Sequence, residues 1–373
     1  MPELWGRSYS RTELLRRMGR LEQVAGVRKI TLDDDQGRGV RILEFRTGSG
    51  FEFDVLVDRA FDIGRCADGG RPLNWTSSVG TIGPWYYEPN TWGWFRAWGG
   101  GMVVTCGLDH TMGPAEDSIA EFHQPHMFKT QEYGLHGRVG GLPARLRGYG
   151  ERWDPDGTCV LWAEGEVRQA SVFGENLVIR RRIEARVGES RFTIHDEVEN
   201  LGFERTSHML LYHCNVGFPV VDAGSELLIP TAGTTTDPWD SIETYRTLTA
   251  PQAHFQEACF YEQITTEPSG LVPTALVNRD LQLGVYQLFD SRQLPAFMIW
   301  RQMGEGTYAV ALEPGTNRAA PRSDLRANGE IIELDPGEIR QYDLELGSLA
   351  GTPAIDAFAA RVGAANVPVA AGG

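Results

Sequence analysis

The sequence lacks the features typical of proteins that bind nucleic acids or associate with membranes. Acidic residues outnumber basic ones by 50 to 35, which gives a formal net charge of −15. This charge disfavours a nucleic acid or an anionic membrane as a partner, because both attract basic patches. No apolar run is long enough to span a bilayer, and the N-terminus lacks the charged and then apolar plan of a signal peptide. We therefore expect a cytoplasmic protein.

Motifs for cofactors and metals are also scarce. The chain has only five cysteines and no CxxC pair, so neither a disulfide framework nor a zinc knuckle is indicated. It has no glycine-rich phosphate loop and no repeat of fixed period. One polar loop combines Asp109 and His110 with Glu121, His123 and His126, but without an HxH or HExxH pattern. We interpret it as a rim loop rather than a metal site, and we expect no cofactor.

The sequence does contain many segments in which apolar and polar residues alternate. Such alternation is typical of half-buried strands, and Gly, Asp, Asn and Pro between the segments are typical of short turns. The clearest segments are 51–57, 177–187, 192–198, 281–289, 308–312 and 342–346. Within 177–187, Arg181 is the one charged residue on the apolar side. The pattern predicts a large antiparallel all-β protein.

Both ends of the chain differ from this strand series. Ser10 and Glu13 form a capping box before apolar residues at helical spacing, which predicts a short N-terminal helix. No composition break divides the strands, so we expect one domain over residues 1–350. Residues 351–373 form a tail rich in Ala, Gly and Pro, in which residues 354–362 suit a short helix before a frayed end.

The segment from Leu210 to Pro219 is the first candidate for chemistry. It begins as an apolar run and then places His213, Cys214 and Asn215 where glycine and proline end the strand. An imidazole has an unperturbed pKa near neutrality, so His213 is suited to proton transfer. The alternative is a half-buried histidine that only hydrogen-bonds a loop.

Two further segments carry titratable groups at turns. His136 lies between turn formers, which predicts an exposed imidazole on a constrained backbone, with Arg138 nearby as a cation that keeps it neutral. Glu313 ends a strand on the face of two alanines, which leave space in front of its carboxylate. Burial there would raise the pKa of Glu313 and make it a candidate base. The alternative is a glutamate that caps a loop or forms a salt bridge.

Arginine and aromatic residues supply candidate binding groups. Arg59 offers a fork of donors for hydroxyls or a carboxylate, or it pairs structurally with Asp58 and Asp62. The aromatic segment from Pro84 to Trp98 has neither strand nor helical spacing and is predicted to be a long loop. Its rings either plug the end of the sheets or cover the apolar faces of a sugar.

Several short strings together resemble a known family. They are Asp-Arg-x-x-Asp-Ile-Gly, Thr-Cys-Gly-Leu, Leu-His-Gly-Arg, Tyr-His-x-Asn-x-Gly-x-Pro and Leu-Glu-Pro, spread between Leu14 and Leu346. This order resembles the aldose 1-epimerase (galactose mutarotase-like) superfamily, and more closely its bacterial DUF4432 branch. The resemblance implies a β-supersandwich of two large antiparallel sheets with a cleft, and sugar ring opening without metal or cofactor. In that reading Glu313 is the base and His213 the acid, on opposite sides of the cleft, and His136 supports the ring side.

The resemblance leaves the sugar-binding groups and the substrate open. The aspartate that binds sugar hydroxyls in the family has no secure counterpart here, and Asp290 is one option. The other candidates for substrate binding are Arg59, Trp98, Arg138, Asn215, Trp300, Arg301 and Gln302. We expect a small-molecule sugar or sugar derivative as the partner, with a homodimer left open. The alternative functions are an isomerase or lyase for an acidic sugar, favoured by the arginines, and a non-catalytic sugar-binding protein.

Overall fold

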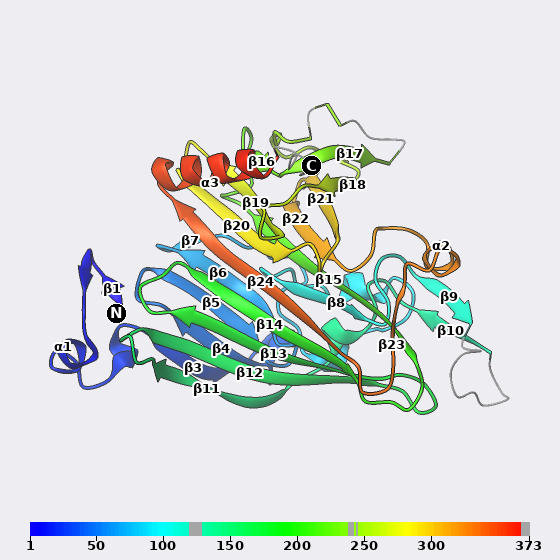
Figure 1. Ribbon diagram of the computed structural model, residues 1–373, viewed down its shortest axis with the longest axis horizontal. Coiled ribbons are helices and arrows are strands. Elements are labelled where there is room, and N and C mark those ends of the chain that lie inside the picture. Colours follow the sequence, from blue (N-terminus) through cyan, green and yellow to red (C-terminus); the bar gives the residue numbers. More distant parts are fainter. Residues whose placement is uncertain (119–128, 238–241, 244, 367–373) are drawn as a thin grey trace, which may run out of the picture.

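Antiparallel β-strands form the framework of the computed structural model, which describes residues 1–118, 129–237, 242–243 and 245–366 (Figure 1). One layer is an eight-stranded sheet whose long strands continue the alternation seen in the sequence. Across this sheet the strands are β11 (Arg145–Trp153), β12 (Cys159–Ala170), β13 (Asn176–Arg186), β14 (Arg191–Asn200), β24 (Ile339–Ala350), β20 (Leu283–Asp290), β19 (Leu271–Asn278) and β16 (Glu226–Leu228). The predicted antiparallel all-β architecture is confirmed.

The opposing layer consists of two sheets. A seven-stranded sheet contains β17 (Thr231–Thr236), β18 (Ala258–Ile264), β21 (Ala296–Gly304), β22 (Thr307–Gly315), β15 (Thr206–Gly217) and β23 (Ile332–Leu334), with β8 (Val104–Leu108) also paired with β15. A five-stranded sheet contains β3 (Gly26–Thr31), β4 (Arg41–Arg46), β5 (Phe51–Leu56), β6 (Asp62–Asp68) and β7 (Arg71–Pro72). An antiparallel bridge between Ile63 and Val103 joins their neighbouring ends.

Short elements close the ends of the chain and the edges of the sheets. They are the ribbons β1 (Glu3–Leu4) with β2 (Arg7–Ser8) and β9 (Ala115–Ser118) with β10 (Thr130–Tyr133), and the helices α1 (Arg11–Leu15), α2 (Arg322–Ala327) and α3 (Thr352–Ala365). The capping box predicted at the first helix is present between Ser10 and Glu13. No helix among the described residues is both long and apolar enough to cross a membrane.

The segment expected as a C-terminal tail contributes a helix to the fold. Helix α3 lies across β19, β20 and β24 at one end of the large sheet (Figure 1). Its apolar side buries Ile355, Phe358 and Val362 against that sheet, as the spacing of these residues indicates. The end expected to fray, residues 367–373, lies outside the described residues.

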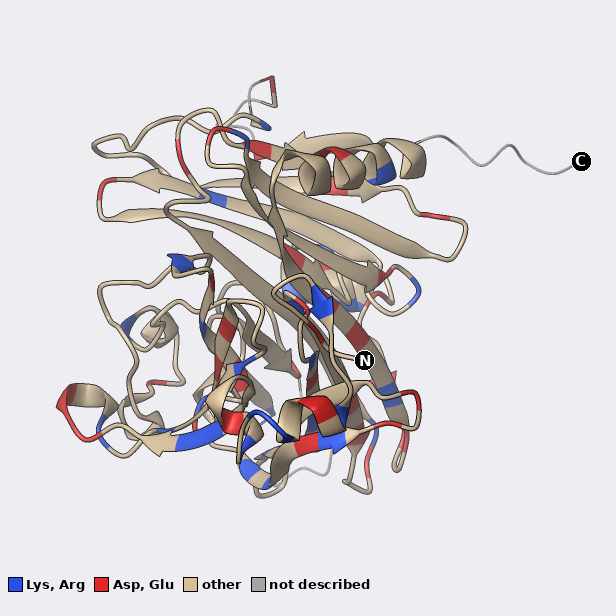
Figure 2. Ribbon diagram, turned by 90° about the vertical axis from the view of Figure 1, so that its left-hand side faces the viewer, with Lys and Arg blue, Asp and Glu red and all other residues tan. Residues whose placement is uncertain are grey.

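The two layers enclose one continuous hydrophobic core. Phe53 of β5 stacks on Phe45 of β4 with ring centroids 4.5 Å apart, and it meets Phe192 of β14 at 4.7 Å. The polar residues that alternate with these positions are more exposed. Acidic and basic positions lie close together along the ribbon (Figure 2). Arg180 of β13, for example, pairs with Glu199 of β14 at 2.6 Å. The alternation in the sequence therefore separates core from surface on each strand.

Strand β15 is buried along its whole length. Its residues Leu210, Tyr212 and Cys214 face the core between the layers, whereas Leu211 packs in a separate cluster of aromatic residues. Because side chains alternate along a strand, His213 points to the same side as Leu211. This strand therefore carries the interior of the fold on one face and the candidate residue His213 on the other.

Candidate active site

His213 and Glu313 meet at the side of a cavity of about 690 Å³. Its walls come from β15, β18, β21 and β22, from the aromatic loop after β7, and from the segments before β9 and around α2. The lining includes three predicted catalytic residues and two predicted binding residues, namely His136, His213, Glu313, Trp98 and Trp300. A cavity of this size is in the usual range for a small-molecule site.

His213 and Glu313 come from neighbouring strands. His213 Nε2 lies 3.2 Å from Glu313 Oε1, and the two side chains are 4% and 0% exposed. Among the described residues, neither oxygen of the Glu313 carboxyl nor Nδ1 of His213 has a hydrogen-bond partner. The sequence reading placed the acid and the base on opposite sides of a cleft, and this was wrong. The pairing of β15 with β22 puts them in contact.

Burial sets the protonation of this pair. It lowers the pKa of His213 to about 3, with the Asn215 side chain acting in the opposite direction. Burial also raises the pKa of Glu313 well above its ordinary value, and the negative Glu257 adds to the rise. Both effects disfavour the charged forms, so burial favours a pair without net charge that shares one titratable proton.

His136 lies beside this pair on a strained backbone. Its φ of 58° is in the left-handed region, and its main-chain N–H donates to the Met112 carbonyl at 2.8 Å. The imidazole lies 5.7 Å from that of His213 and 4.8 Å from the ring of Trp94, measured between ring centroids. The constrained backbone of His136 was predicted correctly. The predicted exposure of its imidazole was wrong, because only 9% of the residue is accessible to solvent.

Similarity to known proteins identifies the family of this chain. A family model described as a domain of unknown function, DUF4432, matches residues 37–347. The chain belongs to the DUF4432 family. Among curated proteins, none matches the sequence significantly.

Solved structures share the fold of this DUF4432 protein. A Klebsiella pneumoniae protein provisionally assigned as an aldose 1-epimerase superposes with a TM-score of 0.83 at 22% identity, over 93% of this chain and 91% of that one. A galactose mutarotase-like protein from Clostridium acetobutylicum gives 0.59 at 13%, over 86% and 98%. Galactose 1-epimerase from Lactobacillus acidophilus gives 0.55 at 12%, over 87% and 99%. At these identities the likeness shows the galactose mutarotase-like fold.

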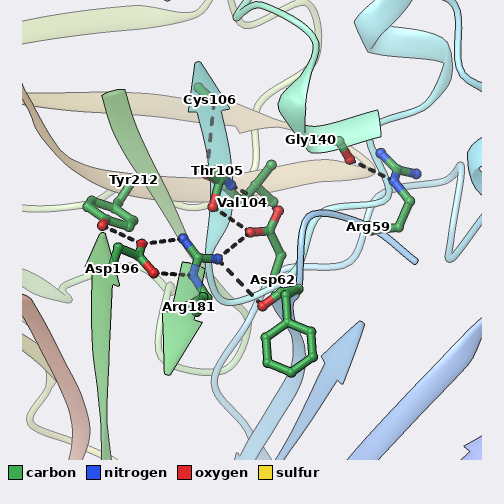
Figure 3. A network of polar contacts seen from close by, with 10 residues as sticks. Arg59, Asp62, Val104, Thr105, Cys106, Gly140, Arg181, Asp196 and Tyr212 are labelled. Carbon is green, nitrogen blue, oxygen red and sulfur yellow. Dashed lines mark hydrogen bonds and ion pairs between the residues drawn. The ribbon is translucent and has the colours of Figure 1, made fainter. Parts of the chain in front are cut away.

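The predicted arginines of the DUF4432 protein do not line the large cavity. Arg138 donates to the Ala170 carbonyl and pairs with Glu175, so the cation expected to keep His136 neutral is engaged elsewhere. The pKa of His136 is instead lowered by burial first, and then by His213 and His110. Arg59 donates to the Gly140 carbonyl at 2.9 Å and lines a separate cavity of about 110 Å³ (Figure 3).

Three other predicted residues also lie outside the cavity, and strand parity explains one of them, Arg301. Trp300 faces the cavity, so the next residue of β21, Arg301, faces the opposite side and lies over the ring of Phe260 at 5.1 Å. Gln302 follows beyond the cavity and accepts from the Gly304 N–H at 2.9 Å. Asp290 forms an ion pair with Arg292 and does not line the cavity either.

Asn215 is a neighbour of the site rather than part of its lining. It is fully buried on the His213 face of β15, and its amide donates to the carbonyls of Gly101 and His213, both at 2.9 Å. It does not line the cavity, so the predicted contact with substrate is replaced by a contact with the backbone of His213.

Several residues at the cavity were not predicted individually. Trp94 packs on Trp98 with centroids 4.4 Å apart, and Glu257 accepts a hydrogen bond from Trp300 Nε1 at 2.8 Å. Asp237 and Glu116 come from segments with no periodic pattern. The aromatic composition of residues 84–98 was the available signal for Trp94, whereas the acidic residues gave none.

The polar loop considered as a metal site is described only in part. His110 is buried, its Nε2 bonds to the Gly113 carbonyl at 2.8 Å, and burial lowers its pKa to about 4. Glu121, His123 and His126 lie outside the described residues. Within the part that is described, no group of three His, Cys, Asp or Glu side chains could hold a metal ion.

Proposed function

We propose that this protein is a carbohydrate-active isomerase of the aldose 1-epimerase type, which interconverts the anomers of a free sugar through ring opening. The observation that carries the proposal is the contact of 3.2 Å between His213 Nε2 and Glu313 Oε1 beside an aromatic cavity. The oxygen of the anomeric hydroxyl and the ring oxygen of a cyclic sugar are both bonded to the anomeric carbon. An acid and a base that serve both oxygens must therefore lie close together, as these two groups do.

The proton balance of the reaction fits the single proton of the pair. In the tautomer with the proton on His213, the Glu313 carboxylate removes the proton of the anomeric hydroxyl. The C1–O1 bond then becomes a carbonyl, the bond from C1 to the ring oxygen breaks, and His213 protonates that oxygen. After rotation about C1–C2, closure in reverse returns the proton. His136 would hydrogen-bond the ring-oxygen side.

The charges around the cavity favour an uncharged sugar over an acidic one. Among the described lining residues the only arginine is Arg322, which pairs with Asp117 at 2.8 Å and donates to Ser207 Oγ at 2.7 Å. The acidic-sugar alternative depended on free arginines near the cleft, and this feature is absent from the described lining. We also propose a cytoplasmic location, and a homodimer remains a prediction from the sequence.

Anomeric exchange measured by magnetisation-transfer NMR tests this function. We expect exchange above the spontaneous rate for at least one aldose in a panel of aldoses, uronic acids and keto-sugars. Glu313→Gln should reduce it by about 10²- to 10⁴-fold, the usual worth of general acid–base catalysis. Glu197→Gln is the control, because that carboxylate lies on the outer surface and accepts from Gln341 at 3.0 Å.

The melting temperature separates lost chemistry from lost folding. Glu313→Gln removes a buried acid without hydrogen-bond partners in the described structure, so the melting temperature should stay the same or rise. A wild-type protein that binds a sugar, with line broadening but no exchange, would support the non-catalytic binding protein instead.

A further inference from the structure

A row of aromatic rings leads from solvent to the candidate catalytic pair. Trp98 lies 5.0 Å from the His213 ring, Trp94 lies 4.4 Å from Trp98, and Phe95 lies 5.8 Å from Trp94, all between centroids. Trp92 completes the row at 6.0 Å from Phe95. All four residues of the loop line the large cavity, so the row is continuous with the site.

Burial decreases along this row. Trp94 and Trp98 are 4% and 7% exposed, whereas Phe95 and Trp92 are 46% and 55% exposed. The planes of Trp92 and Phe95 differ by only 3°, so the two rings present faces of the same orientation. Exposed, parallel aromatic faces beside a pocket gain free energy when a ligand with apolar faces covers them.

The outer rings are held in place relative to His136. Glu88 and Arg96, which flank them in sequence, form a bidentate ion pair with N–O distances down to 2.5 Å. The Thr91 carbonyl accepts from the N–H of Leu135, next to His136, at 2.9 Å. A Cβ at Gly134 would come within 2.0 Å of the Pro89 carbonyl, so the two segments pack backbone to backbone. The outer rings therefore form a preorganised surface.

The charges on the open side of the cavity restrict the ligand. Glu116 and Glu257 are exposed and Asp237 is half-buried, and all three line the cavity. Their negative field disfavours an anionic ligand such as a uronic acid or a sugar phosphate. A neutral carbohydrate has both hydroxyls for these carboxylates and C–H faces for the rings.

We infer that the site takes the reducing end of a neutral oligosaccharide, whose next sugar unit stacks on Trp92 and Phe95. The inference rests on the proposed function, because it places the reducing sugar at His213 and Glu313. The cavity of about 690 Å³ leaves room for more than one sugar ring. The outer rings then determine the preferred chain length, and the inner pair performs the exchange.

A chain-length series tests the inference. We would measure kcat/KM for exchange with glucose, cellobiose, maltose and maltotriose, and with galactose and lactose. In at least one series the disaccharide should exceed its monosaccharide by about tenfold, equivalent to about 1.4 kcal/mol. In the double variant Trp92→Ala, Phe95→Ala this ratio should fall to about one. Trp85→Ala is the control, because Trp85 is an exposed ring of the same loop that does not line the cavity.

Two outcomes would overturn the inference. The first is a kcat/KM for the disaccharide that does not exceed that for its monosaccharide in any series. The second is a disaccharide advantage that is as large in the double variant as in the control Trp85→Ala. Dissociation constants from calorimetry with the same sugars distinguish this failure from failure of the proposed function. If exchange is absent but the affinity rises with chain length and falls in the double variant, the oligosaccharide site stands without the reaction.

Discussion

Two consecutive residues of β15, Tyr212 and His213, reach two different buried clusters of ionisable groups. The Tyr212 hydroxyl donates to Asp196 at 2.6 Å in the core between the layers (Figure 3). His213 contacts Glu313 at 3.2 Å on the cavity side. Both clusters are almost inaccessible to solvent, so burial alone does not distinguish a structural cluster from a functional one. The difference lies in how completely each is hydrogen-bonded.

The core cluster is satisfied on every side. Arg181 bonds to both carboxylate oxygens of Asp196 at 2.8 and 2.7 Å and to Asp62 at 2.8 Å. Asp62 also accepts from the N–H of Thr105 at 2.9 Å and from its hydroxyl at 2.5 Å. Such a network joins the five-stranded sheet, β8 and the large sheet, and it leaves no group of the cluster available to a ligand.

The cavity cluster is incomplete by comparison. Within the described structure, His213 Nδ1, Trp98 Nε1 and both oxygens of Glu313 are buried without hydrogen-bond partners. Buried polar atoms of this kind are rare, and each needs an explanation. A ligand rich in hydroxyl groups is the explanation that agrees with the proposed function. Of these two clusters, the one with incomplete hydrogen bonding faces the cavity, and the one with complete hydrogen bonding lies in the core between the layers.

Removing the charge at the centre of the core cluster should have the largest effect on stability. Arg181→Met leaves Asp62 and Asp196 buried without their cation, which should lower the free energy of unfolding by about 3–5 kcal/mol. Arg180→Met is the matched control, because Arg180 precedes Arg181 on β13 and faces outward. It should lower the free energy of unfolding by less than about 1 kcal/mol. Urea unfolding curves measure both. Equal losses in the two variants would contradict the comparison.

The second prediction concerns His208 of β15, a buried histidine whose two ring nitrogens are both hydrogen-bonded. His208 is satisfied, with Nδ1 bonded to the Leu108 carbonyl and Nε2 to the Tyr342 hydroxyl, both at 2.8 Å. Burial lowers its pKa from 6.5 to about 4. Between these values the unfolded chain binds a proton that the native state does not, so stability falls as the pH falls. One such histidine contributes about 3 kcal/mol over this window, since each pKa unit is worth about 1.4 kcal/mol.

The variant His208→Gln isolates this contribution. The difference in free energy of unfolding between wild type and variant should shrink by about 3 kcal/mol between pH 6.5 and pH 4. His195→Gln is the control, because that imidazole is 42% exposed on the outer face beside Asp343. Parallel pH curves for wild type and His208→Gln would show that the buried histidine does not control acid stability.

The sequence predicted the residues at the cavity better than the partners within the core cluster. Local patterns singled out His213, Glu313 and the aromatic loop with Trp98. The predicted strand ends were wrong, because both residues lie within their strands, β15 and β22. Arg181 stood out as a charge on an apolar face, but its partners, Asp62 and Asp196, follow only from the packing of three separate segments. The sequence offered Arg59 as a partner of Asp62, which the structure does not support.

Predictions of site residues were wrong where the role of a residue depended on the side to which its side chain points. Trp300 and Arg301 are equally plausible ligand contacts in sequence, yet consecutive strand residues face opposite sides, and only Trp300 reaches the cavity. His136 was placed on a constrained turn, but its burial results from Trp94 and His213, which come from distant segments. Local conformation could therefore be predicted, whereas accessibility depended on tertiary packing.

The smallest expected effect concerns the two neighbours on β15 themselves. Tyr212→Phe removes only the hydroxyl that donates to Asp196, so the free energy of unfolding should fall by about 2 kcal/mol, the worth of one hydrogen bond to a charged group. Arg181 still neutralises Asp196 in this variant, which is why the loss should be smaller than for Arg181→Met. Anomeric exchange should remain, because Tyr212 faces away from the cavity.

His213→Gln, one residue along the strand, should show the reverse pattern. It should remove most of the exchange measured by NMR while urea unfolding changes little, because the imidazole is buried with one nitrogen unpaired. If Tyr212→Phe abolished exchange as thoroughly as His213→Gln, the two faces of β15 would be coupled. The hydrogen-bonded core would then support the geometry of the site directly, and the division between scaffold and site would no longer hold.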